Sequence, residues 1–249
     1  MADIKKGVGT VKTESGRIQK KKQIIIVLIL LVVFGFLGYL PVYFYEHRTI
    51  SNIPEPIQIN MEDILAEAQK EEEETGKKVD IETEKTITCN GFRVKMSYLA
   101  TYDIKGLVVI LEDFDTKKGA TSFDRAIPRD LGMAWGFAAE NANKIKWSHS
   151  GRALGFETKN MNWRQVLHSA SNNHIVVEEG QLREKLKKVR RGDFIEIKGY
   201  LVGGEIDDGN GNEKRVFSSS TSRTDHVEHP FDTRTSCEII YLTDLEWLD

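Results

Sequence analysis

Most of the short motifs that identify an enzyme's chemistry are missing from this sequence of 249 residues. It has no glycine-rich phosphate loop and no dinucleotide-binding fingerprint, which argues against a nucleotide held in either of those ways. The G-x-S-x-G turn that carries the nucleophile of many serine hydrolases is also missing. The sequence therefore points to no established reaction, and we predict neither a cofactor nor a metal site.

Cysteine is scarce, with only Cys89 and Cys237 in the whole chain. None of the closely spaced ligand pairs of standard zinc sites occurs, so a zinc site built from His174, His226, His229 and Cys237 has little support. In an oxidising compartment the two cysteines could form one disulfide, which would stabilise the fold by about 4–5 kcal/mol in the chain-entropy model. Two buried free thiols are the alternative.

Basic residues are concentrated at the N-terminus. Residues 1–23 contain seven lysines and arginines and only two acidic residues, Asp3 and Glu14, which gives a net charge of +5. Because the whole chain carries −3, the remaining residues carry −8. An acidic domain lacks the basic face that nucleic-acid binding requires, so we predict no nucleic-acid partner.

Charged residues are absent from positions 24–45, IIIVLILLVVFGFLGYLPVYFY. As a helix this segment would be roughly 33 Å long, enough to cross a hydrocarbon core of about 30 Å. A cleaved signal peptide has a shorter apolar run followed by small residues, whereas this run ends in aromatic residues typical of a membrane interface. We predict a retained transmembrane helix, Ile24–Tyr45, embedded in the lipid bilayer.

The basic flank also predicts the orientation of this helix. Positive residues beside a membrane span stay in the cytoplasm, so residues 1–23 should form a basic cytoplasmic tail and the rest of the chain should lie outside. Pro54 and Pro56 then favour an extended segment. Asn60 is placed to cap an acidic helix that ends near Glu74. We predict that residues 46–85 form a stalk with this helix.

Residues 86–249 have the pattern of one α+β domain. Alternating or continuous apolar runs predict strands, and four-and-three spacing predicts helices. We expect a mainly antiparallel β domain with two or three helices, and a small OB-like barrel is one candidate. The expected strands cover residues 92–96, 106–111, 151–157, 194–202, 216–222 and 237–248, and the expected helices cover residues 128–140 and 179–190.

Polar residues gather in four places in this domain, near positions 128–136, 147–152, 168–174 and 218–238. Bonds from short polar side chains to nearby backbone explain most clusters of this kind without any function. If the clusters share a binding pocket, its residues should be those that loops and strand ends can bring together. The candidate pocket consists of Asp130, Arg152, Asn172, His174, Arg223 and Asp225, with His174 as the candidate general base.

Taken in order, these clusters resemble a family of uncharacterised bacterial membrane-anchored or exported proteins. The resemblance covers about residues 95–245, and this chain differs from the pattern by a longer segment over residues 226–235. It implies a bacterial envelope location and a single folded domain, and it brings no established reaction. The motifs are Pro128-x-Asp130-Leu131, Ser148-x-Ser150-x-Arg152, Asn172-x-His174, Gly199-Tyr200-Leu201-Val202, Ser219-Ser220 with Arg223-x-Asp225, and Cys237-Glu238.

Two functional hypotheses follow. The first is a single-pass protein of the bacterial cytoplasmic (inner) membrane, with its C-terminal domain in the periplasm, that binds or assembles with an envelope protein partner. The second is a membrane-tethered hydrolase-type enzyme in which His174 acts with Asp225 or Cys237. The motif analysis favours the first, so we expect a protein that is not an enzyme.

Overall fold

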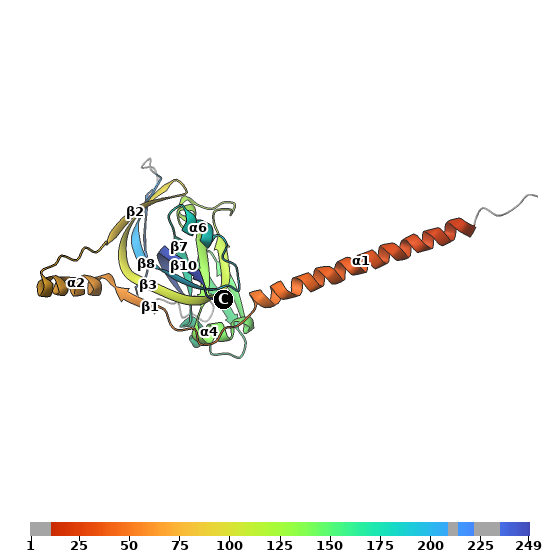
Figure 1. Ribbon diagram of the computed structural model, residues 1–249, viewed down its shortest axis with the longest axis horizontal. Helices are drawn as coiled ribbons and strands as arrows, with labels where there is room; N and C mark the ends of the chain where they lie inside the picture. Colours follow the sequence, from red (N-terminus) through yellow and green to blue (C-terminus); the bar gives the residue numbers. More distant parts are fainter. Residues whose placement is uncertain (1–10, 209–213, 222–234) are drawn as a thin grey trace, which may run out of the picture. The chain divides into compact units, whose positions relative to one another are not determined.

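A computed structural model describes the backbone of residues 11–208, 214–221 and 235–249, and the side chains of these residues except 11–24 and 122. Its contacts divide the chain into two compact units, Met1–Tyr45 and Glu46–Asp249. The described part of the first is a long helix, and the second contains the β-sheet (Figure 1).

Helix α1, Val11–Glu46, contains the apolar run expected to cross a membrane. Its segment Ile25–Glu46 has 22 residues and a mean hydropathy of 2.8, and none of the apolar window is buried against protein. By length and composition this helix can span a bilayer. Pro41 lies inside it, where spanning helices tolerate proline. The direction in which it would cross remains a prediction.

The second unit is an α+β domain with a mostly antiparallel sheet, as the sequence predicts. Eight strands form the main sheet and two more form a separate hairpin. The strands of the main sheet are β1 (Ile57–Asn60), β2 (Glu84–Cys89), β3 (Phe92–Asp113), β4 (Arg129–Ala134), β7 (Ala170–Val176), β8 (Phe194–Asp207), β9 (Lys214–Ser218) and β10 (Ser236–Trp247). The hairpin consists of β5 (Ile145–Ser150) and β6 (Ala153–Thr158).

Five of these strands pair in a circuit. Strand β3 pairs with β4, β4 with β7, β7 with β10, β10 with β8, and β8 pairs again with β3. Only the β7–β10 pair in this circuit is parallel. The 22-residue strand β3 closes the circuit because residues 93–107 pair with β8 and residues 107–113 pair with β4. Strands β1 and β2 also pair with β3.

Each strand of the circuit contributes an isoleucine or leucine to the main hydrophobic core. Ile104, Leu131, Ile175, Ile197 and Ile240 come from β3, β4, β7, β8 and β10 respectively, and none of them is exposed to solvent. Each such side chain removed from water stabilises the fold by about 1.5–3 kcal/mol. The circuit of strands is therefore held by a shared core as well as by backbone hydrogen bonds.

A second core lies beside the first. It is formed by β2, the first half of β3, the end of β8, strand β9 and helix α3 (Ser122–Ala126). Val94, Met96 and Ala126 are completely buried in it. Because α3 reaches this core, the segment between β3 and β4 is fixed in place on the domain.

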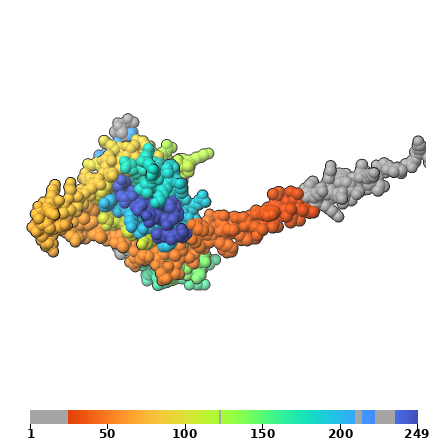
Figure 2. Space-filling view, viewed as in Figure 1, coloured from red at the N-terminus to blue at the C-terminus, as the bar shows by residue number. Residues whose placement is uncertain are grey.

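The expected stalk differs from the structure. Strand β1 pairs with β3, and Ile53 and Met61 are only 4% exposed, so the chain joins the folded domain well before residue 85. Proline keeps the backbone extended, and an extended backbone can also pair as a strand. The acidic helix is confirmed as α2, Met61–Thr75, ended by left-handed Gly76. Figure 2 shows α2 standing out from the rest of the domain.

The helix expected over residues 128–140 is wrong. Residues Arg129–Ala134 form β4, and only Gly136–Glu140 are helical, as α4. Every residue of β4 is buried, so its sequence lacks the alternation that identifies a half-exposed strand. Two or three helices were expected within residues 86–249, whereas the described part of that range has four α-helices: α3, α4, α5 (Trp163–Leu167) and α6 (Gln181–Leu186). Helix α6 confirms the helix expected over residues 179–190, in a shorter form.

The close pairing of β3 with β8 predicts how a methyl group added at a glycine of β8 changes stability. A Cβ added at Gly204 would lie 2.0 Å from the carbonyl oxygen of Lys95, whereas at Gly203 the nearest atom is the Ser218 hydroxyl oxygen at 3.3 Å. We expect Gly204→Ala to lower the free energy of unfolding by about 3 kcal/mol, because two backbones must move apart. Gly203→Ala is the matched control and should be nearly neutral in urea unfolding. Equal effects would contradict the close approach of β3 and β8.

Candidate functional site

The candidate site begins with a register position in the sheet. Asp130 on β4 lies directly opposite His174 on β7, and Asn172 lies two residues from His174 on the same face. Asp130 is completely buried, and its Oδ1 is 2.9 Å from His174 Nδ1. Antiparallel pairing thus places an acid and an imidazole side by side although they are 44 residues apart.

The β5–β6 hairpin brings an arginine to this pair. Gly151, in the left-handed region with φ of 63°, makes the turn, and Arg152 follows it. The Arg152 guanidinium binds both oxygens of Asp130, with Nε 3.2 Å from Oδ2. It also donates to the Ile127 carbonyl at 2.8 Å and to Asp124 at 3.3 Å. Arg152 therefore ties the hairpin to β4 and to α3.

Asn172 connects this ion pair to a second histidine. Its side-chain amide donates to the Arg152 carbonyl at 2.8 Å, and its oxygen is 3.1 Å from His149 Nε2. The other ring nitrogen of His149 is 3.8 Å from Glu112. We call the connected residues the Asp130 cluster: Asp130, Arg152, Asn172 and His174, extended by Glu112, Asp124 and His149.

Two aromatic rings also hold Arg152. Its guanidinium lies 4.2 Å from the centre of the Phe114 ring and 5.5 Å from that of Phe123. A cation over an aromatic face is attracted by the ring quadrupole, and the attraction strengthens when water is excluded. Since the Arg152 side chain is only 16% exposed, these rings help to keep its charge in a partly buried position.

The electrostatics of the cluster favour an ionised Asp130. Burial alone would raise the pKa of Asp130, but the hydrogen bond and charge of His174 and those of Arg152 outweigh it and lower the pKa. Burial lowers the pKa of His149, against the opposing effects of Asn172, Asp130 and Glu112. The cluster is thus a compensated buried ion pair with a neutral histidine beside it.

The structure brings together four of the six residues expected in the candidate pocket: Asp130, Arg152, Asn172 and His174. Arg223 and Asp225, and also His226 and His229, lie outside the described residues. Within the described residues, no group of three or more His, Cys, Asp or Glu side chains is arranged to hold a metal ion.

The two cysteines occupy different places. Cys237 is partly exposed, and its Sγ is 3.8 Å from the Arg152 carbonyl oxygen, at the edge of the Asp130 cluster. Cys89 is buried in the second core, where burial raises the pKa of its thiol to about 11. Both cysteines are free thiols in this structure, and of the two only Cys89 is buried as the thiol alternative expects.

Sequence reasoning missed three members of the cluster. His149 lies in the polar cluster of residues 147–152, outside the expected strands, but it belongs to β5 and its side chain is only 8% exposed. Glu112 and Asp124 also lie outside the expected strands and helices. Lys146, Trp147 and His149 do show the alternation of a strand, and this signal could have identified the hairpin.

Comparisons with protein-family models, curated proteins and solved structures yield no match for this chain. The resemblance expected over residues 95–245 therefore stays a prediction. The functional argument rests on the fold and on the side chains themselves.

The buried ion pair makes a prediction about stability. Asp130→Asn removes the charge but keeps the shape, which leaves Arg152 without its main partner. We expect the free energy of unfolding to fall by about 3 kcal/mol, as when one member of a buried pair is removed. Glu157→Gln is the control, because the Lys146–Glu157 pair is 73% exposed at both side chains and should contribute less than about 1 kcal/mol. Similar shifts in the urea midpoints of both variants would contradict the conclusion that the Asp130–Arg152 ion pair ties the hairpin to β4.

The depressed pKa of His149 makes a prediction about pH. The folded state resists protonation of this ring, so the unfolded state takes up the proton first as the pH falls below about 6.5. Stability should therefore be full at higher pH and decline on acidification through this window. In His149→Gln that decline should be smaller, by at most about 1.4 kcal/mol for each pH unit crossed. Urea titrations at several pH values measure it, and identical profiles would show that His149 protonates freely in the folded protein.

Proposed function

We propose that this chain is a single-pass protein of the bacterial cytoplasmic membrane whose folded domain lies outside and serves in binding or assembly within the cell envelope. The observation that carries the proposal is the helix Ile25–Glu46, long and apolar enough to span, joined to a separate compact unit, Glu46–Asp249. The +5 charge of residues 1–23 supports an inward N-terminus.

The circuit of strands supports a binding role. We infer that β3, β4, β7, β10 and β8 form a small OB-like barrel, because this order, with one parallel pair, is that of a five-stranded Greek-key barrel. Barrels of this kind bind oligonucleotides and oligosaccharides. The net charge of −8 on the chain after residue 23 disfavours an oligonucleotide.

In this proposal the Asp130 cluster stabilises a binding surface from beneath. Asp130 itself is inaccessible, while Arg152 and His174 keep about one tenth to one sixth of their side chains exposed. In this proposal the ion pair fixes the β5–β6 hairpin, and the exposed edge of the cluster contacts a partner protein. The identity of that partner is not part of the proposal.

A membrane-tethered enzyme is the second candidate, and one observation favours it. The Asp130–His174 contact of 2.9 Å resembles the way in which a carboxylate orients a catalytic base. Cys237 Sγ, however, lies 3.8 Å from the Arg152 carbonyl oxygen, and in the β7–β10 register it is Ile239, not Cys237, that lies opposite His174. Turnover of a substrate that is lost in both His174→Gln and Cys237→Ser would favour the enzyme over the binding protein.

The topology is tested by alkaline phosphatase fused after Asp249, because this reporter is active only outside the cytoplasm. We expect an active fusion, and an inactive one when residues 24–45 are deleted. Replacing Lys20, Lys21 and Lys22 by glutamine should lower the active fraction, since these charges help to set the orientation. A stably produced but inactive full-length fusion would overturn the proposal.

The binding role has its own measurement. Crosslinking in intact membranes followed by purification should capture a discrete envelope protein. Loss of that product in Arg152→Ala, with the fold retained, would place the contact near the Asp130 cluster. If no partner is captured while the purified protein turns over a substrate, the binding role is contradicted.

A further inference from the structure

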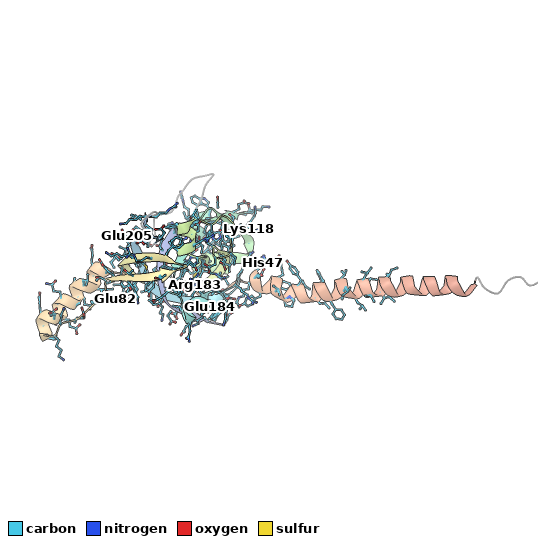
Figure 3. All side chains as sticks on the ribbon, turned by 90° about the horizontal axis from the view of Figure 1, so that it is seen from above. His47, Glu82, Lys118, Arg183, Glu184 and Glu205 are labelled. Atoms are coloured by element: carbon cyan, nitrogen blue, oxygen red, sulfur yellow. The ribbon has the colours of Figure 1, made fainter. Side chains whose placement is uncertain are left out.

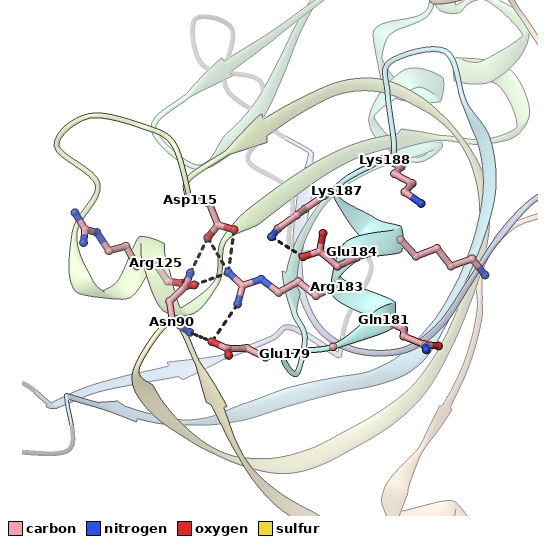
Figure 4. A pocket seen from close by; sticks show the side chains of 11 residues that line it. Asn90, Asp115, Arg125, Glu179, Gln181, Arg183, Glu184, Lys187 and Lys188 are labelled. Atoms are coloured by element: carbon pink, nitrogen blue, oxygen red, sulfur yellow. Dashed lines mark hydrogen bonds and ion pairs between the residues drawn. The ribbon is translucent and has the colours of Figure 1, made fainter.

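A second surface feature is lined by none of the residues of the Asp130 cluster. An open groove of about 1260 Å³ runs along α6 and reaches the β2–β3 turn and α3 (Figure 4). Figure 3 shows Arg183 and Glu184 of α6 close to one another on this surface. The groove is lined by Asn90, Asp115, Arg125, Glu179, Gly180, Gln181, Arg183, Glu184, Lys185, Lys187 and Lys188.

Arg183 organises the groove. It is only 6% exposed, and its guanidinium binds both oxygens of Asp115 at 2.9 Å and lies 3.6 Å from Glu179. Burial opposes its charge, but the hydrogen bond and charge of Asp115 raise the pKa of Arg183 above its ordinary value. Its Nε is buried without a hydrogen-bond partner. The negative charges of Asp115 and Glu179 are thus largely compensated by the positive charge of Arg183.

The other cationic side chains of the groove form fewer ion pairs and hydrogen bonds than Arg183 does. Lys187 pairs with Glu184 at 2.8 Å, and the Lys185 ammonium lies 6.0 Å from the centre of the Trp247 ring. The side chains of Arg125 and Lys188 form no ion pair or hydrogen bond with any described residue, and both are exposed. Five cationic and three acidic side chains line the groove, so it is positive although the domain as a whole is acidic.

We propose that this groove binds a polyanionic chain that carries phosphate groups. Arginine and lysine are the residues that bind phosphate, and here they are spread along the groove. In Figure 4 Arg125 lies on one side of Arg183, and Lys187 and Lys188 lie on the other. The volume of the groove exceeds the roughly 300–1,000 Å³ of sites for small molecules. A chain with regularly spaced charges can contact both ends.

This inference adds a second ligand to the protein contact proposed at the Asp130 cluster. It depends on the proposed function only for the compartment in which the ligand is met. Binding by the purified protein tests the groove whatever the topology. A failure to bind would leave the orientation of the domain untouched, and an inactive reporter fusion would leave the groove untouched.

The test uses the full chain in nanodiscs of zwitterionic phosphatidylcholine and a fluorescent polyphosphate of defined length. The groove variant is the double substitution Arg125→Glu with Lys188→Glu. The control is Lys95→Glu with Lys159→Glu, which makes the same charge change at exposed positions outside the groove. The basic residues 1–23 are present in every sample, so they cannot account for a difference between variants.

We expect the groove variant to weaken polyphosphate binding by about tenfold or more, and the control by about twofold or less. Arg125→Gln with Lys188→Gln should give an intermediate loss, and added salt should reduce the difference between the groove and control variants. Near-ultraviolet circular dichroism verifies that all variants fold.

Four results would overturn the proposal. The first is an equal loss of binding in the groove and control variants, which would indicate attraction by charge alone. The second is orthophosphate binding as tightly as polyphosphate. The third is a single-stranded DNA oligonucleotide of equal charge binding more tightly than polyphosphate, which would indicate a nucleic-acid site. The fourth is binding that depends on the groove only in nanodiscs containing phosphatidylglycerol, which would indicate a lipid headgroup as the phosphate source.

Discussion

The pairing of β3 with β8 is the constraint on which the rest of the domain depends. Fourteen residue pairs join the two strands, from Arg93↔Asp207 to Leu107↔Phe194, and a bulge near Tyr98 lets β3 bend. Without this ladder the order β3-β4-β7-β10-β8 would be an open sheet. With it, the core residues of all five strands face one another. The close approach of the Lys95 carbonyl oxygen to Gly204 follows from the same pairing of β3 with β8.

The polar features depend on this framework in turn. A buried carboxylate is destabilising unless it is paired and hydrogen-bonded. Asp130 is tolerated because β7 supplies His174 and the hairpin supplies Arg152 at fixed positions. The ion pair then fixes the hairpin, which has no pairing with the main sheet. The groove over α6 is built the same way, since Arg183 binds the carboxylate of Asp115 just beyond β3.

Local pattern was enough to find the acidic helix α2, the start of β8 and the apolar runs within β3 and β10. Strand β4 was missed because every residue in it is buried, and β5 was missed although its residues alternate. Strand β7 was not among the expected strands, because Asn172, Asn173 and His174 are uncommon in a strand in which every residue is buried. Residue type alone brought Asp130, Arg152, Asn172 and His174 into one candidate pocket. Their distances depend on register, which no local pattern contains, and Arg183 was expected only as part of the helix over residues 179–190.

The most direct test of this account is hydrogen exchange of the full-length protein, measured by mass spectrometry. The amide hydrogens of a closed circuit of strands exchange with solvent only when the whole domain unfolds. Those of hairpins and projecting helices exchange through local opening. We predict that peptides covering residues 100–107 and 194–201 exchange most slowly, and that α2 and the β5–β6 hairpin exchange much faster. If residues 194–201 exchange as fast as α2, strands β3 and β8 are not paired in solution. The framework that holds Asp130 and the groove would then be incorrect.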